Sequence, residues 1–157
     1  MFSIIAAVGK NRELGQSGKL VFNIKEDMKF FKDTTTGHKV VMGYRTWQSL
    51  PGKLPNRQNI VVSSDPVDNA DLTISDLPAF IKENKDTEEE IFIIGGGMIY
   101  SQFIDYAKNL YLTEIDATAP DADVFFPDFD KSKYTKTIIK KGSQDDLIYA
   151  FVKYTKN

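Results

Sequence analysis

Short apolar runs alternate along the chain with segments in which apolar residues recur at helical spacing. In FSIIAAV (residues 2–8) the apolar residues are nearly continuous, which is typical of a strand buried on both faces. The same reasoning predicts further strands and intervening helices, and the turn residues GSQDD favour an antiparallel hairpin near the end of the chain. We expect strands at 39–43, 59–64, 71–74, 90–97, 109–115, 134–141 and 147–154, and helices at 23–35, 44–50, 77–84 and 98–107.

This alternation predicts a single α/β domain over residues 1–157. Its core would be a mostly parallel, twisted central sheet with helices on both faces, joined by a C-terminal antiparallel hairpin. In sheets of this kind, ligands bind beyond the carboxyl ends of the strands. The segments that follow each predicted strand are therefore the places to look for chemistry.

The helix predicted at 23–35 carries an acid within its apolar face. Asn23 and Glu26 have the spacing of a capping box at the helix start. Positions i, i+3, i+4 and i+7 share one helix face, so Asp27 lies among apolar residues there. The apolar members of this stripe are Ile24, Met28 and Phe31.

A carboxylate in an apolar stripe is unfavourable unless a partner satisfies it. Asp27 can be satisfied by the backbone or by a threonine, or it can face water at the helix start, where the helix dipole favours an acid. Alternatively, the partner is a ligand: a planar ring with adjacent N–H donors would bind both carboxylate oxygens. The aromatic or apolar walls of such a pocket would be Phe22, Met28 and Phe31.

Three predicted strands end in residues suited to phosphate. Glycines 95–97 follow a strand and precede a helix, so backbone N–H groups can approach an anion closely. The segment 43–46 (GYRT) repeats that arrangement, and Ser63 and Ser64 add hydroxyls at the end of a third strand. Each segment alone is as compatible with a plain turn. Together, on one sheet edge, they suit a dinucleotide.

Composition excludes several other classes of function. The chain has 41% apolar and 27% charged residues and a net charge of −2, with no basic stripe for nucleic acid or an anionic membrane. No apolar run is long enough to span a bilayer, and we see no signal peptide. There is no cysteine, and His38 is the only histidine, which excludes disulfides, thiolate sites and multi-histidine metal sites. We expect a cytoplasmic, monomeric protein.

Beyond these patterns, the chain resembles the dihydrofolate reductase family along nearly its whole length. The resemblance rests on IIAAV followed by a glycine-bearing loop, on Asp27 with Phe31, and on VVMGYRTWQSLPGKLPNRQNIVVSS. It continues through IIGGGMIY, LYLTEIDA and DVFFPDFD. It implies NADPH-dependent reduction of 7,8-dihydrofolate to tetrahydrofolate, by hydride transfer to the pterin and protonation of the adjacent ring nitrogen. It also implies antifolates as ligands.

The resemblance further implies roles for individual residues. Asp27 would bind the pterin and underlie proton delivery, with Thr113 hydrogen-bonded to it, and Arg57 would clamp the glutamate α-carboxylate of folate. Residues 14–20 would form a lid, and the first peptide of the glycine triplet would be cis. Substrate would contact Ile5, Ala6, Asp27, Met28, Phe31, Leu50, Leu54, Arg57, Ile94, Tyr100 and Thr113. NADPH would contact Ala7, Leu14, Gly15, Leu20, Gly43, Tyr44, Arg45, Thr46, Ser63, Ser64, Gly95, Gly96, Gly97, Met98, Ile99, Tyr100 and Gln102.

The sequence departs from the family pattern around the lid and the phosphates. Val21 and Phe22 replace the usual Pro-Trp, and Lys25 replaces a proline often found two residues before the acid. Tyr44 and Met98 stand where basic residues commonly face phosphates. We expect Arg45, together with Ser64, to bind the 2′-phosphate instead.

Two other functions remain open at this stage. One is a reductase of the same fold that acts on a pyrimidine intermediate of riboflavin synthesis; Arg57 and the Asp27–Phe31 pair favour folate over it, since that pyrimidine has no glutamate tail. The other is a nucleotide-binding module without catalysis, which the joint presence of Asp27, Thr113, Tyr100 and Arg57 argues against.

Overall fold

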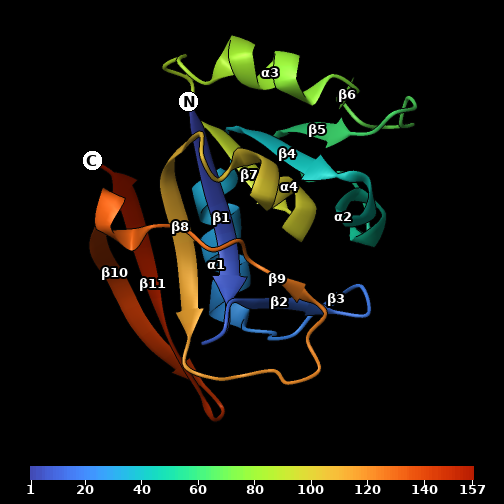
Figure 1. Ribbon diagram of the computed structural model, residues 1–157. Helices are drawn as coiled ribbons and strands as arrows, with labels where there is room; N and C mark the ends of the chain where they lie inside the picture. The colour runs from blue at the N-terminus through green and yellow to red at the C-terminus, as the bar shows by residue number, and fades with distance from the viewer.

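A computed structural model describes residues 1–157 as a central eight-stranded sheet with helices on both faces (Figure 1). The strand order is β10-β11-β8-β1-β7-β4-β5-β6. The C-terminal strands β10 (Tyr134–Gln144) and β11 (Leu147–Lys156) form an antiparallel hairpin, and β11 pairs antiparallel with β8. The six other strands are mutually parallel: β1 (Phe2–Val8), β4 (Lys39–Gly43), β5 (Gln58–Val62), β6 (Leu72–Ile74), β7 (Ile91–Gly95) and β8 (Ala107–Ile115).

The two faces of the sheet hold separate apolar cores, because successive side chains of a strand point to opposite faces. On one face, Ile4 belongs to the cluster that includes Ile81 of α3 and Phe103 of α4. On the other face, Ile5 belongs to a cluster against which Phe30 of α1 and Trp47 of α2 pack. The helices are α1 (Lys25–Thr35), α2 (Tyr44–Ser49), α3 (Leu77–Asn84), α4 (Gly97–Phe103) and the 3₁₀ turn η1 (Lys131–Lys133).

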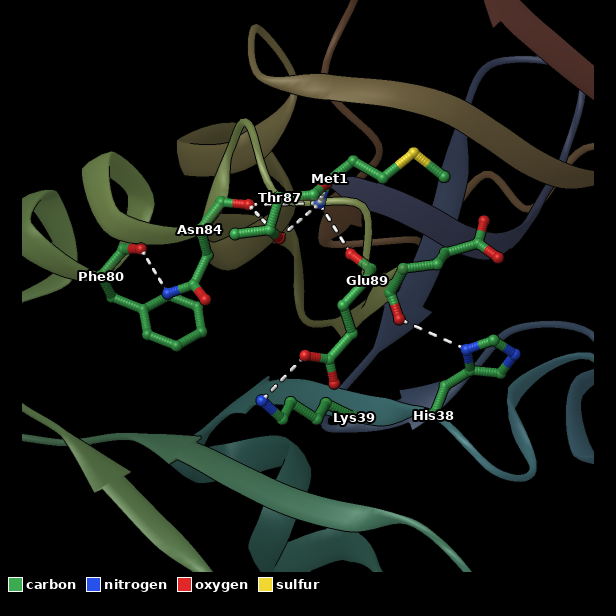
Figure 2. A network of polar contacts seen from close by, with 8 residues as sticks. Met1, His38, Lys39, Phe80, Asn84, Thr87 and Glu89 are labelled. Atoms are coloured by element: carbon green, nitrogen blue, oxygen red, sulfur yellow. Dashed lines mark hydrogen bonds and ion pairs between the residues drawn. The ribbon is translucent and has the colours of Figure 1, made fainter.

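The amino ends of the parallel strands are joined by polar contacts (Figure 2). The Met1 ammonium donates to the backbone carbonyls of Thr87 and Glu89, both at 2.7 Å, and to that of Asn84 at 3.2 Å. Lys39, the first residue of β4, forms a salt bridge of 3.1 Å with Glu89. These contacts connect the starts of β1 and β4 to the segment before β7, so the opposite, carboxyl ends are left for ligand binding.

The predicted fold class is confirmed, and the predicted helix at 77–84 has the observed bounds with Asp76 as its cap, accepting from the Ala79 N–H at 3.1 Å. One feature was missed: a small sheet of β2 (Glu13–Gln16), β3 (Lys19–Leu20) and β9 (Val124–Phe125). We expected a loop here, and the error has a physical cause. These strands are only two to four residues long, and β2 pairs with β9 more than a hundred residues later.

The predicted cap of α1 was wrong. Ile24 occupies the N-cap position with an extended backbone, and no side chain of its own segment caps the helix. Glu26 turns toward the C-terminal hairpin rather than back to Asn23. The expected buried stripe is also only partly correct, since the Ile24 side chain is 2% exposed whereas that of Met28 is 63% exposed.

Candidate active site

The acid of α1 is paired with a threonine of the sheet. The Thr113 hydroxyl, on β8, donates to Asp27 Oδ1 at 2.5 Å, so the predicted contact between these residues is confirmed. Thr113 lies near the carboxyl end of β8 and pairs in register with Ala7 of β1. Asp27 is therefore held at the carboxyl ends of two central parallel strands, where α/β sheets bind ligands.

The surroundings of Asp27 favour its protonated form. Burial raises the pKa of this carboxyl above its ordinary value, and the Thr113 hydrogen bond opposes that change only in part. The nearby titratable groups are phenols: Asp27 helps to raise the pKa of Tyr100 and of Tyr149, although burial is the larger cause for both. No basic side chain bonds to Asp27, and its hydrogen-bond partner in the chain is Thr113 of the sheet. A ligand with N–H donors would add a second partner, and a cationic ligand would add the first positive charge.

A buried tyrosine connects α4 to β1 beside the site. The Tyr100 hydroxyl, on α4, donates to the backbone carbonyl of Ile5 at 2.7 Å. The β1–β7 register ends at the pair Ile4–Ile93, so the two strands are no longer paired at Ile5 and Ile94. The backbone carbonyls of Ile5 and Ile94, two of the predicted substrate contacts, therefore lie where the sheet opens.

Arg57 lies against the C-terminal part of α1. Its Nη1 donates to Thr35 Oγ1 at 3.0 Å and its Nε to the Pro55 carbonyl at 2.9 Å, while the guanidinium lies 5.9 Å from the centre of the Phe31 ring. Burial lowers the pKa of Arg57, which nonetheless stays far above neutrality. Leu50 and Leu54 are half-buried against the same cluster as Phe31. The structure thus brings Arg57, Phe31 and these leucines together on one side of the sheet.

The glycine triplet adopts an unusual backbone at the end of β7. The Gly95–Gly96 peptide is cis, as the resemblance implied, and Gly95 has φ of 133°, a value that side chains rarely allow. A Cβ at Gly95 would lie 3.5 Å from both the Thr46 and the Tyr100 hydroxyl oxygens. The backbone of the triplet therefore passes directly beside polar groups of α2 and α4.

A cavity of about 650 Å³ lies beside α2 and the segment after β5. Three of the predicted cofactor contacts, Tyr44, Ser63 and Ser64, line it, whereas Arg45 does not. Two acids that we did not predict, Asp65 and Asp68, line it instead. Asp65 directly follows the serines and Asp68 lies three residues further on, and they carry no motif of their own, so only their place in the fold draws attention to them. The other lining residues are Trp47, Gln48, Leu50, Gly52, Pro66 and Val67.

The predicted lid is held through the small sheet. Glu13, whose residue is 2% exposed, accepts from the Ala119 N–H at 2.6 Å and from the Asn11 N–H at 2.7 Å. Asp123 accepts from the Ser17 N–H at 2.9 Å. These contacts place Glu13 and Asp123 among the residues that order the segment predicted to form the lid, and sequence reasoning named neither of them.

The other predicted contact residues are spread over the same edge of the sheet. Ala6 and Ala7 are half-buried on β1, and Gly43 packs closely enough on Ile99 that a Cβ there would lie 3.0 Å from Ile99 Cγ1. Leu14 is buried in the core, so only its backbone is free to face a cofactor. Leu20, Tyr44, Met98 and Gln102 are exposed, as is the tip around Gly18.

An α/β domain with a buried acid at the carboxyl ends of its central strands, next to a glycine-rich edge with hydroxyl groups, has the arrangement expected of a dinucleotide-dependent reductase. The family model described as dihydrofolate reductase matches residues 1–156. The dihydrofolate reductase of Bacillus subtilis is 34% identical, with 99% of this chain and 95% of the relative covered, and that of Neisseria gonorrhoeae is 36% identical, with 97% and 96% covered. A dihydrofolate reductase from Enterococcus faecalis, solved in complex with NADP(H) and RAB-propyl, superposes with a TM-score of 0.86 at 29% identity, covering 100% of this chain and 96% of that one.

The chain therefore belongs to the dihydrofolate reductase family, whose reaction is the NADPH-dependent reduction of dihydrofolate. The resemblance seen in the sequence is confirmed over the whole domain. No helix of the structure is both long enough and apolar enough to cross a membrane.

Proposed function

We propose that this chain reduces 7,8-dihydrofolate to tetrahydrofolate with NADPH, and that Asp27 and Thr113 form its catalytic centre. The observation that supports this most directly is the Asp27 carboxylate, bonded to Thr113 through Oδ1 alone. Its second oxygen is free to accept from the ring of a substrate. A pterin offers an amino group and a ring nitrogen side by side, which suits a bidentate contact with a carboxylate.

Residues of the chain would orient the substrate and position a proton for transfer to it. Asp27 would fix the pterin edge, and burial, by raising the pKa of its carboxyl, makes it hold a proton near the ring more readily than an exposed carboxyl would. The Ile5 and Ile94 carbonyls would accept from the pterin amino group at the opening between β1 and β7, and Arg57 would bind the glutamate α-carboxylate. NADPH, when bound, supplies the hydride. Holding both reactants in contact makes the transfer effectively unimolecular.

We further propose that the cofactor lies along the carboxyl ends of β4, β5 and β7. Gly95–Gly97, Thr46 and the hydroxyls of Ser63 and Ser64 are grouped there, beside the cavity next to α2. The glycine backbone fits a pyrophosphate, because no Cβ occupies the space beside Thr46. The lid strands β2 and β3 would cover the nicotinamide end and exclude water from the reacting atoms.

The experiment that tests the function is the loss of NADPH absorbance when dihydrofolate is added to the purified chain. We expect turnover by the wild type and loss of most of it in Asp27→Asn near pH 7, with circular dichroism showing that the variant still folds. Binding of NADPH without any turnover by the wild type would instead favour a non-catalytic nucleotide-binding module. Turnover of a pyrimidine without a glutamate tail, in preference to dihydrofolate, would favour the riboflavin-pathway alternative.

We also propose that the chain acts as a cytoplasmic monomer and binds antifolates at the substrate pocket. The charge of −2, with no basic stripe, supports the expectation that neither nucleic acid nor a membrane surface is a partner. Size-exclusion chromatography with light scattering tests the monomer, and competition between an antifolate and dihydrofolate tests the shared pocket.

A further inference from the structure

The C-terminal hairpin supports both members of the Asp27–Thr113 pair. In the register of β11 with β8, Phe151 lies opposite Thr113. The ring of Phe151 also stacks on that of Phe30 of α1, with ring centroids 4.5 Å apart and planes inclined by 22°. Thr113 lies on β8 and Asp27 lies on α1. Strand β11 contacts both elements and therefore sets the position of each.

Side chains near the tip of the same hairpin hold the start of α1. The backbone N–H of Lys25 donates to Gln144 Oε1 at 2.8 Å, and Gln144 Nε2 donates to the Asn23 carbonyl at 3.0 Å. The N-cap residue, Ile24, has no side-chain oxygen to satisfy the first N–H groups of the helix. Gln144 supplies the missing acceptor from 119 residues further along the chain.

Glu26, next to the acid, is held by two more hairpin residues. The Tyr149 hydroxyl donates to Glu26 Oε1 at 2.7 Å, and Lys140 Nζ lies 2.6 Å from Oε2. A Cβ at Gly142 would lie 2.6 Å from Glu26 Oε1 and 2.7 Å from Tyr149 Cε1, so a side chain at residue 142 would displace the Glu26–Tyr149 contact. Tyr149 is 4% exposed and the Glu26 side chain is 33% exposed, so this contact is partly buried.

We propose that Gln144 and Tyr149 are positioning residues for the reaction: from the C-terminal hairpin they fix the first turn of α1, and thereby hold Asp27 against Thr113 and the pterin. Neither residue touches the reacting atoms. The proposal rests on the proposed function, because the catalytic consequence exists only if Asp27 acts on dihydrofolate.

The decisive variant is Gln144→Ala, with Ser143→Ala as the matched control. Ser143 is the preceding residue of the hairpin, is exposed, and makes no side-chain contact with α1. A displacement of about 1 Å at a reacting group can lower a rate by about 100-fold, so a partial release of α1 is expected to lower kcat by about 10-fold. The KM for NADPH should stay within about twofold of the wild type, because the cofactor edge lies on other elements. The pH profile of hydride transfer should also shift, since the Thr113 bond to Asp27 is weakened.

A second substitution tests the mechanism of the effect. Lys25 is the first helical residue, and Ile24 before it has φ of −117° and ψ of 120°, which a following proline accepts. Lys25→Pro removes the N–H that Gln144 satisfies. In the double variant Lys25→Pro, Gln144→Ala, residue 25 has no N–H that loss of Gln144 Oε1 could leave unpaired. Gln144→Ala should therefore cost less activity in the Lys25→Pro background than in the wild type. Tyr149→Phe, which removes one hydroxyl only, should lower kcat in the same direction by a smaller factor.

Wild-type turnover is measured in parallel, so failure of the function and failure of this inference are separable. If the wild type does not oxidise NADPH with dihydrofolate, the proposed function fails. If the wild type is active and Gln144→Ala lowers the melting temperature but leaves kcat and the pH profile unchanged at a temperature where it is folded, the residue is structural only and the positioning role is overturned. An equal loss from Gln144→Ala in both Lys25 backgrounds also overturns it.

Discussion

Asp27 illustrates how a side chain that is unfavourable for stability can be suited to the chemistry proposed for it. Its burial disfavours the charged form, and a single hydrogen bond from Thr113 offsets only part of that effect. An apolar residue at this position would continue the stripe formed by Ile24 and Phe31. The carboxylate is therefore a local conflict with the helix pattern, and such conflicts are expected at functional sites.

The first prediction concerns the stability of Asp27→Asn. Because the pKa of Asp27 is raised in the folded chain, the native state retains a proton that the unfolded chain releases above its ordinary pKa of 3.8. Wild-type stability should therefore fall as the pH rises from about that value through the folded-state pKa. Asparagine does not ionise and therefore lacks this pH-dependent loss of stability. Asp27→Asn should be more stable than the wild type at pH 7 and similar to it near pH 3. Urea unfolding at both pH values measures this, and an unchanged difference would contradict the raised pKa.

The second prediction concerns cofactor choice. Asp65 lines the cavity beside Ser63 and Ser64, whereas Arg45 lies outside it, so a 2′-phosphate there would meet a negative charge. At solvent-exposed sites a charge pair at about 4 Å contributes about 1 kcal/mol, or about fivefold. We expect Asp65→Asn to raise the ratio of kcat/KM for NADPH to that for NADH by about fivefold. The sequence-based expectation that Arg45 binds the 2′-phosphate predicts that Arg45→Ala lowers the same ratio, whereas its position outside the cavity predicts no change. Equal efficiencies with the two cofactors in the wild type would remove the proposed recognition of the 2′-phosphate.

At the scale of elements, the site depends on pieces that have little stability of their own. Strand β3 has two residues, β2 has four and β9 has two, so the small sheet requires side chains that pin it to the domain. Glu13 is the most buried of these, accepting N–H groups from Asn11 and Ala119. Burial acts to raise the pKa of Glu13, but these backbone hydrogen bonds outweigh it, and the pKa is lowered.

The third prediction follows from that arrangement. Glu13→Gln replaces one carboxylate oxygen with an N–H₂ group, so one of the two backbone donors loses its acceptor, at a cost of about 1–3 kcal/mol. Because the folded-state pKa of Glu13 is lowered, its contribution to stability is fully present above the ordinary pKa of 4.5 and is lost as the pH falls through the folded value. The difference between the two proteins in free energy of unfolding should therefore shrink in acid. A constant difference from pH 7 to pH 3 would show that the charge of Glu13 is not involved.

At the scale of the whole molecule, stabilising contacts gather at one end of the parallel strands and the proposed ligand-binding residues at the other. The amino ends of the strands are bound together by the Met1 ammonium and the Lys39–Glu89 salt bridge (Figure 2). The carboxyl ends carry Asp27's partner Thr113, the glycine triplet and the serines. Ligands are therefore expected to add stability at the end of the molecule that the chain itself leaves open.

The fourth prediction tests this at the level of global unfolding. A ligand that binds only the folded state at about 100 times its Kd raises the free energy of unfolding by about 2.7 kcal/mol. For a domain of this size, that corresponds to an increase in Tm of roughly 5–11 °C. NADPH should produce such a shift in differential scanning fluorimetry, and folate added with it should raise the Tm further. No shift at saturating NADPH would exclude a cofactor site formed by the native fold.

The sequence by itself determined the class of fold and most of the strands, because continuous apolar runs and helical spacing depend on residues close to one another in the chain. It also indicated Asp27, Thr113 and the glycine triplet, through a resemblance carried by local motifs. Only the tertiary structure decided what caps α1, what holds the lid and what lines the cavity beside Ser64. For the first two, the physical reason is that Gln144 meets Lys25, and Glu13 meets Ala119, across more than a hundred residues, and no local pattern encodes such contacts. The cavity forms because the pairing of β4 with β5 places α2 beside the segment that follows β5.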